Sequence, residues 1–179
     1  MKIAVVDDSK FTRMVIKQIL NDLSNTDFCW EAENGKVALE KNTRDPVDLI
    51  ISDLEMPVLD GLQLLKTVIG GESKTNCLLI SAFHKSNQPK IIDALKAGAI
   101  GFIEKNSLGK GFDINSLKKE IDKYINFLTQ DNILKKEIRA TSLENHLRKP
   151  VVKNRADFIL SLIHISEPTR PERIAYAGL

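Results

Sequence analysis

The sequence contains no long apolar run and only two cysteines, Cys29 and Cys77. No apolar stretch reaches the length that spans a bilayer, and Met1-Lys2 leads into a short expected strand rather than a signal peptide. The spacing of the two cysteines matches neither a zinc site nor a disulfide framework, which suits a reducing cytosol. A net charge of only +2 gives no reason to expect nucleic-acid or membrane binding. We therefore expect a cytoplasmic protein that binds neither directly.

The sequence does show a regular alternation of short apolar segments and helical segments. Its composition, with 28% charged and 42% apolar residues, is typical of a soluble globular domain. Ile3–Val6 and Leu49–Ile51 are apolar throughout, as expected for strands that are covered on both faces. The expected strands are Lys2–Val6, Phe28–Ala32, Leu49–Asp53, Cys77–Ser81 and Gly101–Lys105.

Helices are expected between these strands and after the last one. Phe11, Val15 and Ile19 recur at helical spacing, and Leu117–Leu128 carries an amphipathic stripe. The other expected helices are Lys36–Lys41, Leu62–Ile69 and Pro89–Ala97. Five strand–helix units predict an α/β fold, with a doubly wound parallel sheet, right-handed crossovers and helices on both faces.

The sequence changes character after Leu128, where we place the end of the first domain (residues 1–128). Residues 129–155 are polar and charged, and Pro150 ends any helix in this stretch. We interpret residues 129–159 as a linker and the possible start of a lost output domain. A continuation of the last helix up to Lys149 is the alternative that the sequence leaves open.

Acidic, hydroxyl and amino side chains stand at the ends of four expected strands. Asp7 and Asp8 follow the first strand, Asp53 ends the third, Ser81 the fourth and Lys105 the fifth. In an open parallel sheet, ligands bind at the carboxyl ends of the strands near the point where the strand order reverses. Three carboxylates held there repel one another unless a cation intervenes, and Mg²⁺, which prefers oxygen ligands, is the natural occupant.

Four motifs together resemble the receiver domain of two-component response regulators over residues 1 to about 128. The motifs are Val5-Val6-Asp7-Asp8-Ser9, Asp53-Leu54-Glu55-Met56-Pro57 with Asp60-Gly61, Ile80-Ser81-Ala82, and Ala97-Gly98-Ala99 with Phe102-Ile103-Glu104-Lys105. The resemblance implies a flavodoxin-like sheet of five strands in the order 2-1-3-4-5. It also implies that a sensor histidine kinase phosphorylates the chain, which then controls an output domain in cis.

The resemblance further assigns roles to the residues around the acidic cluster. Asp53 is the implied phosphoacceptor, and it binds Mg²⁺ directly together with Asp8. Asp7 acts mostly through water, and Glu55 lends its backbone carbonyl to the metal. The implied role of Lys105 is to pair with an oxygen of the phosphoryl group.

Two further residues form the implied switch. Ser81 hydrogen-bonds the phosphoryl group, and Phe102 fills the space that Ser81 vacates as it is drawn inward. The surface around the fourth helix and the fifth strand then changes. One position departs from the family, because Asn106 follows Lys105 where a proline is usual. Since a non-proline cis bond costs about 3 kcal/mol, we expect a trans bond there and a locally shifted loop.

The last part of the sequence does not resemble a natural domain. Leu160–Arg170 has neither helix nor strand period, and its eleven residues are the in-frame translation of a transposon-end sequencing adapter. We therefore interpret residues 160–179 as an adapter-derived artefact that ends a truncated gene, and we expect them to be disordered.

The identity of the lost output domain is predicted from three segments, which resemble the chemotaxis protein-glutamate methylesterase/deamidase: Asp53–Pro57, Ser107–Ile114 and Arg155–Ile159. In that family a receiver and a linker precede an α/β esterase domain, and the kinase partner is a chemotaxis kinase. The esterase triad is absent from this sequence, so the chain itself is expected only to phosphorylate itself on Asp53.

The sequence bears on three other functions. The receiver of a DNA-binding transcriptional regulator and a stand-alone receiver that acts by protein contact remain open. A metal-dependent phosphatase with an aspartyl intermediate is disfavoured. It would need a second aspartate two positions after the nucleophile, where this sequence has Glu55.

Overall fold

The computed structural model describes residues 1–71, 74–81, 88–105 and 114–144, with side chains described as far as residue 130. Strands and helices alternate along the chain, as predicted. The strands are β1 (Lys2–Val6), β2 (Asp27–Ala32), β3 (Leu49–Asp53), β4 (Asn76–Ser81) and β5 (Gly101–Glu104). The helices are α1 (Lys10–Asn21), α2 (Gly35–Arg44), α3 (Gly61–Gly70), α4 (Gln88–Lys96) and α5 (Ile114–Glu144).

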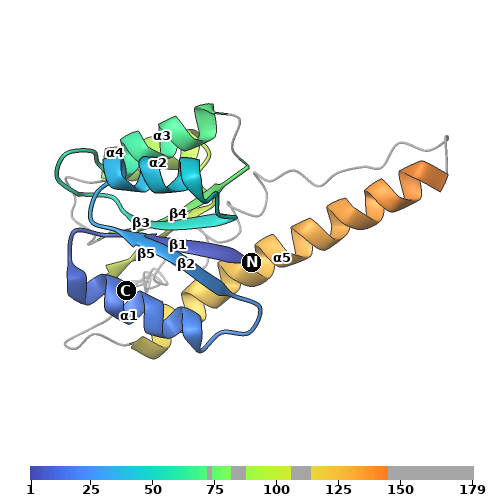
Figure 1. The fold of residues 1–179 in the computed structure, drawn as a ribbon, viewed down its shortest axis with the longest axis horizontal. Coiled ribbons are helices and arrows are strands. Elements are labelled where there is room, and N and C mark those ends of the chain that lie inside the picture. The colour runs from blue at the N-terminus through green and yellow to red at the C-terminus, as the bar shows by residue number, and fades with distance from the viewer. Residues whose placement is uncertain (72–73, 82–87, 106–113, 145–179) are drawn as a thin grey trace, which may run out of the picture. The chain divides into compact units, whose positions relative to one another are not determined.

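The strands form one parallel sheet in the order β2-β1-β3-β4-β5. Helices α2, α3 and α4 cover one face of the sheet, and α1 and α5 cover the other (Figure 1). This arrangement confirms the predicted doubly wound α/β fold and its strand order. The order along the chain reverses between β1 and β3, so the carboxyl ends of these two strands are where a ligand is expected.

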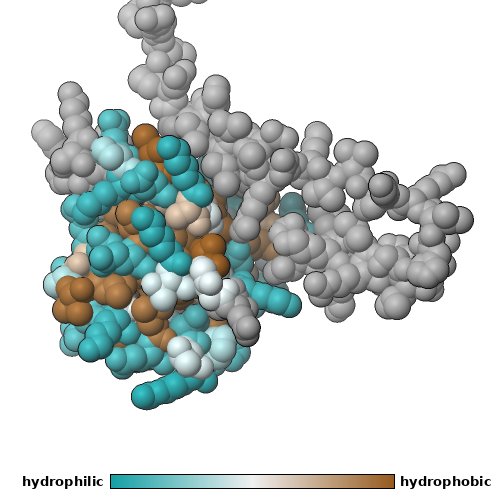
Figure 2. All heavy atoms as spheres, turned by 90° about the horizontal axis from the view of Figure 1, so that it is seen from above, coloured by the Kyte–Doolittle hydropathy of each residue, from teal (hydrophilic) through white to brown (hydrophobic). Residues whose placement is uncertain are grey.

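The central strands are buried on both faces, which explains their apolar sequences. All four residues of Ile3–Val6 have an exposed fraction of 0%. Because successive side chains of a strand point to opposite faces, β1 contributes to both apolar layers, with Ala4 and Val6 in the layer under α2, α3 and α4. Over those helices, small groups of apolar residues lie among hydrophilic ones (Figure 2), as expected when the main apolar stripes face the sheet.

Polar side chains fix where three helices begin. Ser9 and Asn34 each accept a hydrogen bond from the backbone N–H three residues further on. Asp60 and Gln63 form a reciprocal pair at the start of α3. Such caps satisfy N–H groups that a helix leaves without partners, and each contributes about 1 kcal/mol. They start α1 and α3 directly after the loops that follow β1 and β3.

Several predicted boundaries are wrong. β5 ends at Glu104, so Lys105 directly follows the strand, and α2 is longer at both ends than predicted. The last helix continues past Leu128 to Glu144, so the helical alternative holds for the start of the segment that we interpreted as a linker. The charged residues of this segment, mostly lysine and glutamate, are good helix formers, which is why the helix can extend.

Some predictions fall outside the described residues. They concern the peptide bond after Lys105, the loop at Asn106, the rest of the segment that we interpret as a linker, and residues 160–179, which we interpret as adapter-derived. In the part of the chain that the structure describes, no helix is both long and apolar enough to cross a bilayer.

Gly61 begins α3 where no side chain fits. A Cβ at this position would lie well inside contact distance of the Asp53 carbonyl oxygen and 3.0 Å from the Cα of Leu54. Both are backbone atoms, which cannot rotate away as a side chain can. The start of α3 therefore depends on glycine, and so does the position of the strand end that carries Asp53.

We expect Gly61→Ala to destabilise the protein by about 1–3 kcal/mol, because the added methyl group forces α3 and β3 apart. Gly70→Ala, at the other end of α3, is the matched control, since no heavy atom lies within 4 Å of a Cβ added there. The control should stabilise by about 0.5–1 kcal/mol. Urea unfolding of both variants measures the difference, and equal effects would contradict the close approach at Gly61.

Candidate functional site

The strand register brings the predicted site residues to one end of the sheet. The pairing of β1 with β3 sets Asp7, which directly follows β1, level with Asp53 at the end of β3. Ser81 ends β4, and Lys105 directly follows β5. Four strands thus deliver polar side chains to the same edge, as the sequence predicts.

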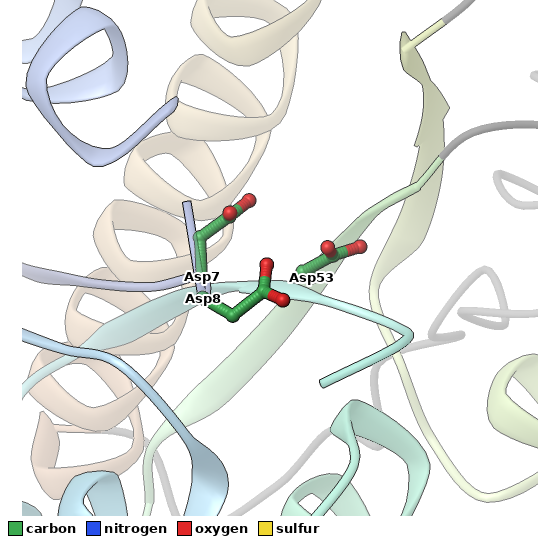
Figure 3. A group of neighbouring side chains, drawn as sticks. All are labelled: Asp7, Asp8 and Asp53. Carbon is green, nitrogen blue, oxygen red and sulfur yellow. The ribbon is translucent and has the colours of Figure 1, made fainter. Parts of the chain in front are cut away.

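Three carboxylates meet at this edge (Figure 3). Asp7, Asp8 and Asp53 offer oxygen atoms that all lie within 4.8 Å of one another. Asp7 and Asp53 are buried, with exposed fractions of 1% and 8%, whereas Asp8 is exposed. The predicted convergence of these three acids is confirmed. Oxygen atoms at this spacing, with one side open to water, fit a single hard divalent cation such as Mg²⁺.

Lys105 holds the two buried acids together. Its Nζ lies 2.8 Å from Oδ2 of Asp7 and 2.9 Å from Oδ2 of Asp53. A cation at these distances attracts both carboxylates and offsets the repulsion between them. Backbone N–H groups satisfy the other two oxygens, from Ser9 to Asp7 Oδ1 at 2.9 Å and from Leu54 to Asp53 Oδ1 at 2.8 Å.

The carboxylate of Asp8 is in a different position. Among the described residues, no hydrogen bond or ion pair to its carboxylate is found. Asp8 therefore has its oxygens available for a ligand, whereas those of Asp7 are both occupied by donors. The available oxygens of Asp8 fit direct binding of a cation. Asp7 and Asp53 are alike in this respect, since both oxygens of Asp53 also accept from donors.

Burial and charge act against each other on the two central groups. Burial raises the pKa of Asp53, the hydrogen bond and charge of Lys105 lower it without cancelling this effect, and Asp7 raises it further. Burial alone would lower the pKa of Lys105, but Asp53 and Asp7 outweigh burial and raise it. Lys105 is therefore held in its charged form, while ionised Asp53 keeps an excess of unfavourable energy that another cation can relieve.

The other predicted site residues lie nearby, in less direct positions. Ser81 is buried at the end of β4, with an exposed fraction of 2%. Phe102 is half-buried and packs against the core. The side chain of Glu55 is exposed, and its carboxylate lies 3.9 Å from Nζ of Lys90. The roles predicted for these residues, including that of the Glu55 backbone carbonyl, remain predictions.

Sequence reasoning missed Arg13 and the backbone donor of Leu54. The guanidinium of Arg13 donates to the carbonyl oxygens of Asp7 and Asp8. One signal was present, because arginine in the first turn of a helix opposes the helix dipole and calls for a compensating contact. The N–H of Leu54 gives no signal, since every residue except proline has one.

A doubly wound sheet that presents three acids and a lysine at the carboxyl ends of its strands has the arrangement of a receiver module in two-component signalling. The response regulator receiver domain family matches residues 3–122, and the chain belongs to this family.

Two of the similar curated proteins are protein-glutamate methylesterases/protein-glutamine glutaminases. The chain is 32% identical over 152 residues to protein-glutamate methylesterase/protein-glutamine glutaminase 1 of Syntrophomonas wolfei, which covers 85% of this chain and 41% of that protein. It is 38% identical over 120 residues to the protein-glutamate methylesterase/protein-glutamine glutaminase of Pyrococcus horikoshii, which covers 67% of this chain and 32% of that protein. The chain thus spans about two fifths or less of the length of these relatives.

Solved structures agree with this family. The response regulator domain of Thermotoga maritima CheB superimposes with a TM-score of 0.63 at 29% identity, covering 72% of this chain and 96% of that chain. A structure of the P1 domain of CheA3 in complex with CheY6 from R. sphaeroides matches with a TM-score of 0.56 at 28% identity, covering 70% and 96%. Both matches extend over nearly the whole of the other chain.

Because three acids face one another, we expect Mg²⁺ to raise the Tm of the protein. Saturation at about 100 times Kd would stabilise it by about 2.7 kcal/mol. Asp8→Ala should abolish this response, and it should leave the metal-free protein at least as stable, since it relieves repulsion. Asp93→Ala, which removes an exposed acid of α4, is the control and should keep the response. Thermal melts with Mg²⁺ and with EDTA test this, and a full response in Asp8→Ala would contradict its role.

Proposed function

We propose that this receiver takes a phosphoryl group onto Asp53 from a phosphohistidine of a sensor histidine kinase, with the help of Mg²⁺. The observation that carries this proposal is the bridge from Lys105 to Asp7 and Asp53 beside the open carboxylate of Asp8. An acid that is buried, paired with a lysine and close to two further acids has what a phosphoacceptor needs. The nucleophile is in place, and so are charges that can offset those of the transferred group.

The reaction needs little from the protein beyond position and charge. A carboxylate oxygen of Asp53 attacks phosphorus in line, an O–P bond forms, and the P–N bond to the histidine breaks, leaving imidazole on the kinase. The raised pKa of Lys105 keeps its ammonium charged beside the group that arrives. The Leu54 N–H, 2.8 Å from Asp53 Oδ1, orients the carboxylate for the attack.

The metal would be held directly by Asp8 and Asp53, through water by Asp7, and by the backbone carbonyl of Glu55. Bound Mg²⁺ supplies positive charge that offsets the phosphoryl oxygens during transfer. The donor set supports this assignment, because it consists of oxygen atoms and keeps one exposed acid at the rim.

We further propose that phosphorylation changes the outer surface of the domain through Ser81 and Phe102. The new phosphoryl oxygens accept a hydrogen bond from Ser81 and draw it inward. Phe102 then moves into the space that Ser81 leaves. Support comes from their places in the fold, since Ser81 is buried at the end of β4 and Phe102 lies half-buried on the neighbouring strand β5.

The output that this receiver controls is proposed to be a chemotaxis methylesterase, phosphorylated by a chemotaxis kinase in the cytoplasm. The methylesterase names of the curated relatives support this proposal, as does the CheB receiver among the solved structures. The chain spans about two fifths or less of the length of these relatives, so the esterase activity of the whole protein is part of this proposal.

Acetyl phosphate with Mg²⁺ should label the wild-type protein with one phosphoryl group, because Asp53 is the acceptor. Asp53→Asn should reduce labelling to background, and Asp93→Asn should not change it. Mass spectrometry of peptides locates the label, and release by hydroxylamine near neutral pH identifies an acyl phosphate rather than a phosphoserine. A label stable to hydroxylamine, or one that persists in Asp53→Asn, would refute the assignment.

The parent gene can be tested directly. Amplifying the locus from source DNA without tagmentation, and reading beyond Phe158, should reveal an esterase domain with a serine in a glycine-rich segment. A DNA-binding domain, or a stop codon soon after Leu128, would support the other two receiver classes instead. Codons that continue through Leu179 to a natural stop would refute the adapter interpretation.

A further inference from the structure

Arg13 occupies an unusual place for a cation. It belongs to the first turn of α1, where the helix dipole disfavours positive charge. Its side chain is nevertheless largely buried, with an exposed fraction of 12%. A guanidinium is costly to bury unless hydrogen bonds and charges compensate. The contacts that Arg13 makes should therefore explain why it is there.

These contacts connect α1 with β2 and with Asp7 and Asp8, the two acids that follow β1. Nη1 of Arg13 lies 2.7 Å from the carbonyl oxygen of Asp7 and 3.4 Å from that of Asp8. Nε lies 3.4 Å from Oε1 of Glu31 on β2. The backbone N–H of Arg13 also donates to the carbonyl of Ser9, the residue that caps α1. The loop between β1 and α1 is thus tied to the side chain and the backbone of one residue.

The two acids depend on this loop to different degrees. Asp7 has further ties besides the one from Arg13, because its N–H donates to the carbonyl of Ala32 and its carboxylate accepts from Ser9 and Lys105. For Asp8, the contact from Arg13 is the one side-chain hydrogen bond found among the described residues. The direction of the Asp8 carboxylate is therefore set through its backbone, and Arg13 holds that backbone.

We propose that Arg13, kept in place by Glu31, is a positioning residue that turns the Asp8 carboxylate toward Asp53 and so sets the affinity of the site for Mg²⁺. This inference rests on the proposed function, since it assumes that Asp8 binds the metal. Arg13 touches neither the metal nor the phosphoryl group and acts through the carbonyl oxygens of Asp7 and Asp8.

A positioning role and a purely electrostatic role of Arg13 predict opposite changes in Mg²⁺ affinity when Arg13 is removed. If Arg13 acted only as a nearby positive charge, removing it would strengthen Mg²⁺ binding, because repulsion of the metal would fall. If it positions Asp8, removing it should weaken binding. Outer-shell partners of metal ligands typically account for roughly 10-fold to 100-fold in affinity. The sign of the change therefore distinguishes the two roles.

The experiment is titration calorimetry of the full chain with Mg²⁺, alongside melting curves in EDTA. We expect Arg13→Met to raise Kd roughly 10-fold to 100-fold, while the rate of labelling by acetyl phosphate at saturating Mg²⁺ stays close to wild type. Arg13→Lys keeps the charge but cannot span both carbonyls and Glu31, so it should also raise Kd. Lys10→Met removes an exposed charge from the same turn and should leave Kd equal or slightly lower.

Each outcome decides the proposal. An unchanged or lower Kd in both Arg13 variants would overturn it, as would a lower Tm in EDTA with an unchanged Kd, which marks a purely structural role. If Arg13→Met does not fold, Arg13→Lys decides on the same criterion. A wild-type protein that neither binds Mg²⁺ nor labels Asp53 would instead overturn the proposed function itself.

Discussion

The ammonium of Lys105 lies between the carboxylates of Asp7 and Asp53, at 2.8 and 2.9 Å. Without a cation there, two buried carboxylates side by side would repel, and one would take up a proton or the strand ends would separate. The bridge requires β1 next to β3, β4 next to β3 and β5 next to β4. The charge balance of the site therefore depends on the strand order of the sheet. That order brings Lys105, which is distant in the sequence from Asp7, to the two carboxylates.

Much of this arrangement is predictable because central parallel strands must be apolar on both faces. The runs Ile3–Val6 and Leu49–Ile51 locate β1 and β3, and the acids that end them are then placed at the ligand-binding edge. The ends of elements are less predictable. Residues 129–144 suit either a linker or a helix, because their charged side chains favour both, and the hydrogen-bonded backbone is what distinguishes them.

The residues that sequence reasoning missed are those whose importance comes from contact between elements. Arg13 looks like any surface cation until the carbonyls of Asp7 and Asp8 are seen beside it. Gly61 stands in one of the sequence motifs, but the reason for glycine there appears only when the backbone of Asp53 is placed against it. Periodicity and composition describe one element at a time. They show which face of a helix is buried, but not which residues of other elements the helix contacts.

The strand order also bears on how the chain can fold while it is being synthesised. β1 emerges first and lies inside the sheet, β2 joins one side, and β3, β4 and β5 add in turn on the other. Each new strand finds an edge already made, so assembly can follow the ribosome without rearrangement. If assembly follows synthesis in this order, Asp7 and Asp53 meet before Lys105 joins them. The acids of such a nascent chain would be assembled without the balancing charge until the last strand is added.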